Sequence, residues 1–205
     1  MNDQPDEIEK SKPAVFLLRW AAILFWLWAV WWLMMATHEA GHVFAAWATG
    51  GQIDRVELSP LAFSHTELIT NPEPMMVVWA GPVCGVIAPL LLWLGVLFQR
   101  KRKWASRDLQ TTTFLAGFCL VANGGYIGLG WLDRVGDTNE MLHLGTPIPV
   151  MIAFGLVSTC GGLALWHRLG PLSRLKQITT PYALYLLTTS LLIVGLGFAV
   201  AHMIG

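Results

Sequence analysis

The sequence predicts an all-α membrane protein, a bundle of about five transmembrane helices with a short β-hairpin in the loop between the first and second. Of its 205 residues, 55% are hydrophobic and only 13% are charged, whereas soluble domains have about a quarter charged residues. Eleven Trp and 20 Gly suit bilayer interfaces and closely packed helices. A formal net charge of zero excludes a general nucleic-acid-binding surface. We expect one domain, residues 1–205.

Five runs of about 20 apolar residues, each long enough to cross a bilayer, define the expected spans. They are residues 14–48, 75–98, 111–131, 147–167 and 182–203. A helix over 14–48 would be about 50 Å long, whereas the hydrocarbon core is about 30 Å thick. This first helix must therefore tilt, bend or protrude.

The loop over residues 50–73 carries two short alternating patterns that predict strands. The first contains Ile53, Val56 and Leu58, and the second begins near Phe63. The dipeptide at residues 59–60, Ser-Pro, predicts the turn between them. An isolated hairpin is marginally stable in water, so we expect this one to lean on the helices or the membrane surface.

Glycines in the third span, among them Gly124 and Gly128, have two interpretations. They either allow another helix to pack closely, which we favour, or loosen the span for entry of a substrate.

The distribution of Lys and Arg predicts the orientation, because positive charge in short loops is retained in the cytoplasm. Eleven of the 13 basic residues lie on the side of the N-terminus, and only Arg55 and Arg134 lie on the other. We therefore expect a multi-pass protein of the cell membrane with a cytoplasmic N-terminus and an extracytoplasmic C-terminus. Topology explains the basic runs without a nucleic-acid partner.

The sequence HEAGH at residues 38–42, near the end of the first span, matches the pattern H-E-x-x-H. Residues one helical turn apart lie on one face, so His38 and His42 can bind a single Zn²⁺. Glu39 lies about 100° around the helix, where it can contact a metal-bound water. An ionisable trio within an apolar run is energetically costly unless it binds something.

Catalytic zinc usually has three protein ligands and one open position. Asp137 is the best candidate for the third ligand, because it is expected on the same side of the membrane as the end of the first span. Asp133 and Glu140 are alternatives, and Asp137 can also be interpreted as a helix N-cap.

This combination resembles the site-2 protease family of intramembrane zinc metalloproteases. The resemblance rests on HEAGH inside a spanning helix, Ala-Gly-Pro at residues 80–82 in the next span, and Gly-Asp at residues 136–137. It implies that His38, His42 and Asp137 hold zinc and that Glu39 activates water. It also implies that Asn123 binds the substrate, at the oxyanion or the backbone, although the usual Asn-x-x-Pro run before Asp-Gly is missing. The alternative is that Asn123 serves helix packing.

The expected function is therefore zinc-dependent hydrolysis of a peptide bond in or near a transmembrane segment of a membrane protein substrate, with Glu39 as general base. The alternative is a non-catalytic zinc-binding membrane protein that scaffolds partner membrane proteins. A fourth protein ligand that closes the metal site would favour this alternative.

Overall fold

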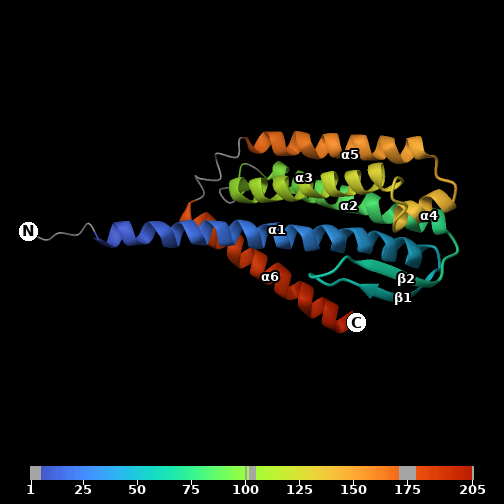
Figure 1. Ribbon diagram of the computed structural model, residues 1–205, viewed down its shortest axis with the longest axis horizontal. Coiled ribbons are helices and arrows are strands. Elements are labelled where there is room, and N and C mark those ends of the chain that lie inside the picture. The colour runs from blue at the N-terminus through green and yellow to red at the C-terminus, as the bar shows by residue number, and fades with distance from the viewer. Residues whose placement is uncertain (1–5, 100, 102–104, 171–178, 205) are drawn as a thin grey trace, which may run out of the picture.

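A computed structural model (Figure 1) places every residue except 1–5, 100, 102–104, 171–178 and 205, and it confirms the predicted fold class. The described chain forms six helices and one two-stranded sheet. In chain order these are α1 (Asp6–Ala48), β1 (Gln52–Glu57), β2 (His65–Thr70), α2 (Pro74–Phe98), α3 (Ala105–Gly130), α4 (Asp137–His143), α5 (Ile148–Leu169) and α6 (Thr180–Ile204).

Five of the described helices, α1, α2, α3, α5 and α6, are long and apolar enough to cross a membrane. Their bounds follow the expected spans, except that α1 and α3 begin several residues earlier than expected, at Asp6 and Ala105. The sequence reading missed α4, because seven residues are too few to reveal a helical period.

Several basic residues used to predict the orientation lie outside the described residues. They are Arg100, Arg102, Lys103, Arg174 and Lys176.

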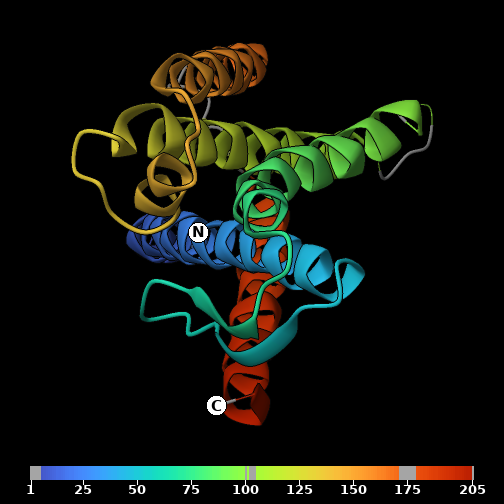
Figure 2. The same ribbon diagram turned by 90° about the vertical axis from the view of Figure 1, so that its right-hand side faces the viewer.

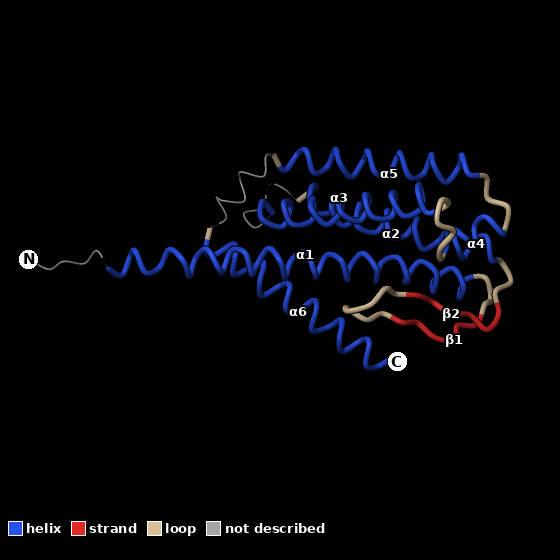
Figure 3. Tube along the Cα trace, in the orientation of Figure 1, coloured by secondary structure: helices blue, strands red, loops and turns tan. Residues whose placement is uncertain are grey.

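The helices pack in layers around α1, which runs along the long axis of the molecule (Figures 1 and 2). Helix α2 packs against both α1 and α3, and α5 covers α3 on the outside. Helix α6 contacts α1 on the opposite side and diverges from it toward the C-terminus (Figure 1). The hairpin and α4 lie at the same end of the bundle, where α1 ends (Figure 3). Segments distant in the sequence therefore meet at one end of the molecule.

Glycines allow α3 and α5 to pack closely. A Cβ at Gly128 would lie 2.9 Å from the Cα of Gly155, and a Cβ at Gly124 would lie 2.9 Å from the Gly155 carbonyl oxygen. Larger residues at these positions would push the helices apart. These glycines therefore serve close helix packing, as we favoured.

Side chains of α1 hold the hairpin, as expected for a sheet that is marginal alone. The indole of Trp28 donates a 2.9 Å hydrogen bond to the Pro60 carbonyl, and Trp32 donates to the Leu58 carbonyl at 3.4 Å. Phe63 lies in the connecting loop rather than in β2, and its ring meets Trp31 edge-on. Residues 58–64 form a longer connection between the strands than the turn predicted at residues 59–60.

Candidate metal centre

Helix α1 places His38 and His42 on one face, as their spacing predicts. The two imidazole centroids lie 4.9 Å apart, and both side chains are buried. The helix continues without a break through both residues to Ala48, so the spacing of one turn is fixed by regular backbone geometry.

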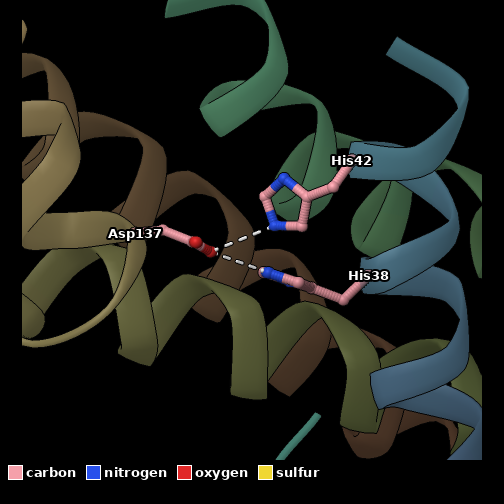
Figure 4. A group of neighbouring side chains, drawn as sticks. All are labelled: His38, His42 and Asp137. Carbon is pink, nitrogen blue, oxygen red and sulfur yellow. Dashed lines mark hydrogen bonds and ion pairs between the residues drawn. The ribbon is translucent and has the colours of Figure 1, made fainter. Parts of the chain in front are cut away.

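Asp137 reaches the two imidazoles from the start of α4 (Figure 4). One carboxylate oxygen, Oδ2, lies 2.8 Å from His38 Nε2 and 3.4 Å from His42 Nε2. Gly136 is the N-cap of α4, with φ 55° and ψ −137°, a conformation that favours glycine. The Asp137 side chain is thus directed to the histidines and is not the helix cap. The structure brings together the three residues that the sequence indicated.

The charge of Asp137 is favoured by these contacts. Burial alone raises the pKa of this carboxyl, but the hydrogen bonds from His38 and His42 outweigh it and lower the pKa well below its usual range. The carboxylate therefore stays ionised, which is the form that a metal ion binds.

The donor set fits zinc. Zinc bonds of about 2.0–2.1 Å in a tetrahedron separate neighbouring ligand atoms by about 3.3 Å. The 3.4 Å between His42 Nε2 and Asp137 Oδ2 is close to this value, whereas the 2.8 Å between His38 Nε2 and Asp137 Oδ2 is a hydrogen-bond distance. Each histidine also has its other nitrogen engaged: Nδ1 of His38 with Asn123 Oδ1 at 2.7 Å, and Nδ1 of His42 with the Val77 carbonyl at 2.9 Å. Because Nδ1 donates in both bonds, loss of the Nε2 proton leaves on each Nε2 the lone pair that a metal needs.

Three ligand atoms converge here, and no other His, Cys, Asp or Glu among the described residues joins them. Asp133 and Glu140, the alternative third ligands, are exposed and lie outside the cluster. Three protein ligands leave one position of a tetrahedron for water or substrate.

Glu39 is buried beside the cluster, and the hairpin holds its carboxylate. Ser64 donates a 2.8 Å hydrogen bond to Oε1, and Thr66 donates a 2.7 Å bond to Oε2. No sequence pattern indicates these two contacts, since hydroxyl residues in a polar loop are commonplace. They satisfy a buried carboxylate without a positive charge and tie the hairpin to the residue expected to act as base.

Glycines of α2 make room for the site. A Cβ on Gly81 would collide with the His42 imidazole, and a Cβ on Gly85 would lie 2.7 Å from the Asn123 amide. The two residues are one turn apart, so they present a flat strip of backbone to two polar side chains. This contact gives a physical reason for the glycine in Ala-Gly-Pro.

Asn123 lies on α3 and is almost fully buried. Its Oδ1 accepts the hydrogen bond from His38, and its Nδ2 donates to the Cys119 carbonyl at 2.9 Å. The structure thus shows Asn123 supporting His38. Contact with substrate, which the resemblance implies, stays a prediction.

A family model described as Peptidase M50B-like matches residues 13–130, more than half of the chain. The chain belongs to the M50B-like peptidase family. The match includes His38, Glu39, His42 and Asn123, whereas Asp137 lies beyond it, so its place at the site rests on the structure. No significant match was found among curated proteins or solved structures.

Membership of the M50B-like family indicates an intramembrane metalloprotease, in agreement with the resemblance noted from the sequence. The five apolar helices make this peptidase a multi-pass membrane protein, and its His-His-Asp cluster can bind a metal ion.

Replacing Gly81 with Ala should weaken zinc binding about 10- to 100-fold, the usual effect of disturbing support around a ligand, because the added methyl group displaces His42. Zinc content of the purified protein and chelator competition would measure the effect. Gly95→Ala in the same helix is the matched control, since no atom lies within 4 Å of a Cβ there. A Gly81→Ala protein with wild-type zinc affinity would contradict this account of the glycine.

Asn123→Leu should also reduce zinc affinity about 10- to 100-fold, because Nδ1 of His38 loses its acceptor. Asn123→Asp keeps an acceptor oxygen and should retain more of the affinity in the same chelator competition. If Asn123→Leu changes only the KM for a substrate and leaves zinc affinity intact, the residue contacts substrate and does not support His38.

Proposed function

We propose that this protein is an intramembrane zinc endopeptidase that hydrolyses a peptide bond in or near a transmembrane segment of a membrane protein substrate. The observation that carries the proposal is the convergence of His38, His42 and Asp137 at one end of a membrane bundle, with Glu39 beside them. Two imidazoles, one carboxylate and an open position are typical of catalytic zinc.

In this proposal His38, His42 and Asp137 hold Zn²⁺. When bound, the ion would lower the pKa of a water molecule and polarise the scissile carbonyl. Glu39 accepts a proton as the water oxygen bonds to the carbonyl carbon, and it delivers that proton to the amide nitrogen as the C–N bond breaks. The products are a carboxyl group and an amine, so no further reactant is needed.

The hairpin offers a way to hold the substrate. A helical segment hides its carbonyls in hydrogen bonds to residue i+4, so it must unwind before cleavage. Strands β1 and β2 form a sheet of only two strands, which leaves an unpaired edge for an extended peptide. Thr66 of β2 contacts Glu39 directly, so a peptide added next to β2 would lie close to the base.

The proposed orientation in the membrane rests on the distribution of Lys and Arg. We infer a cytoplasmic N-terminus from the excess of Lys and Arg on that side. The metal centre lies at the opposite end of α1, so in the cell membrane it would be near the extracytoplasmic surface. Its substrates would then be cleaved toward that face.

The three-residue cluster also bears on the scaffold alternative. A purely structural zinc site usually has four protein ligands, whereas the described residues supply three. The open position therefore favours hydrolysis over a structural role for the metal.

Glu39→Gln should bind zinc as the wild type does and lose cleavage of a transmembrane substrate, because an amide cannot accept the proton from water. Zinc analysis and cleavage of a purified substrate in detergent or liposomes test both parts. Full residual cleavage by this variant would refute the proposed mechanism.

Asp137→Ala should lose stoichiometric zinc and, with it, cleavage, because a three-ligand site becomes a two-ligand site. Asp133→Ala is the matched control, as Asp133 is an exposed carboxylate on the same connection. Metal analysis of both variants decides the point. Full zinc in the Asp137→Ala protein would transfer the third-ligand role to Asp133 or Glu140.

A further inference from the structure

Tyr126 lies one turn beyond Asn123 on α3 and contacts two parts of the metal centre. Its phenol oxygen accepts a 2.9 Å hydrogen bond from the backbone N–H of Asp137. Its ring meets His38 edge-on, with centroids 6.0 Å apart. A Cβ on Gly136 would collide with the phenol oxygen, so glycine at this position is needed for the contact as well as for the backbone conformation.

The phenol proton has no acceptor among the described residues, because the one hydrogen bond of this hydroxyl is the bond it accepts from Asp137. A phenol can donate one hydrogen bond while accepting another. Tyr126 thus retains a donor beside Asp137 and His38, and its side chain is partly exposed.

Four other polar side chains around the cluster donate hydrogen bonds within the protein. Ser64 and Thr66 donate to Glu39, and the Asn123 amide nitrogen donates to the Cys119 carbonyl. Thr138 on α4 donates to backbone carbonyls of residues 130 and 135. Among the hydroxyl groups named here, only that of Tyr126 has its hydrogen uncommitted. The Asn123 amide nitrogen carries a second hydrogen, but that side chain is almost fully buried.

We propose that Tyr126 is a catalytic residue that donates its hydroxyl hydrogen bond to the oxygen of the scissile carbonyl. The inference rests on the proposed peptidase function. When the water oxygen bonds to the carbonyl carbon, the π electrons of the C=O bond move to its oxygen, which becomes negative. A donor already fixed by Asp137 and His38 stabilises this charge without reorganisation. Tyr126 keeps its proton, and Glu39 supplies the proton of the leaving amine.

Tyr126→Phe removes the donor and leaves the ring against His38. Loss of one such donor typically lowers kcat about 10²- to 10³-fold, with KM changed less than about twofold because the charge is absent from the ground state. Cleavage kinetics on a purified transmembrane substrate measure both constants. Zinc affinity, from chelator competition, should equal that of the wild type.

A peptide phosphinate provides a readout that a merely structural role would not change. Its tetrahedral, negatively charged group resembles the transition state, so its affinity should fall by the same factor as kcat in Tyr126→Phe. Binding of the uncleaved substrate, measured with Glu39→Gln as background, should be equal with Tyr or Phe at position 126.

Tyr185→Phe is the matched control, because it removes the same hydroxyl from a residue that donates to Asp108 at the other end of α3. It should leave kcat, KM and phosphinate affinity unchanged. Wild-type kcat in Tyr126→Phe would overturn the inference, and so would a loss of zinc affinity, which would make Tyr126 a positioning residue for Asp137. A wild-type protein that cleaves no transmembrane segment would instead refute the proposed function itself.

Discussion

The contact between the Asp137 carboxylate and the imidazoles of His38 and His42 is the constraint on which the rest of the structure depends. It joins α1 to α4 across 99 positions of sequence, and it gathers polar groups at one end of an apolar bundle. Such groups are costly near lipid unless each finds a partner. Asn123, the Val77 carbonyl and two hairpin hydroxyls provide those partners. The architecture around the centre serves to keep these groups satisfied.

Much of the fold could be predicted because hydrophobicity and length decide it. A span needs about 20 apolar residues in any context, and the spacing of His38 and His42 is a property of the helix itself. Asp137 could be proposed because topology placed it at the correct end. These predictions rest on local sequence patterns and on the side of the membrane predicted for each loop. Both can be obtained from the sequence alone.

The supporting contacts could not be predicted in the same way. Ser64 and Thr66 reach Glu39 from a hairpin that Trp28 and Trp32 hold against α1. A Ser or Thr in a loop has no distinguishing pattern. The hydrogen bond between Asp137 and Tyr126 forms only if the loop after α3 returns to the side chain of Tyr126. The role of Gly81 depends on which imidazole lies above it. Each contact arises from tertiary packing between elements distant in the sequence, which periodicity does not encode.

Under the proposed function, the attachment of the hairpin to Glu39 would couple two events, the docking of a substrate and the release of the base. Both oxygens of this carboxylate are bound by one short segment, residues 64–66, so any shift of that segment loosens both bonds together. An incoming strand that pulls the hairpin away from α1 would free the carboxylate in the same movement. Substrate docking and the release of Glu39 would then occur in one movement. Without a substrate, the Glu39 carboxylate would stay hydrogen-bonded to the hairpin.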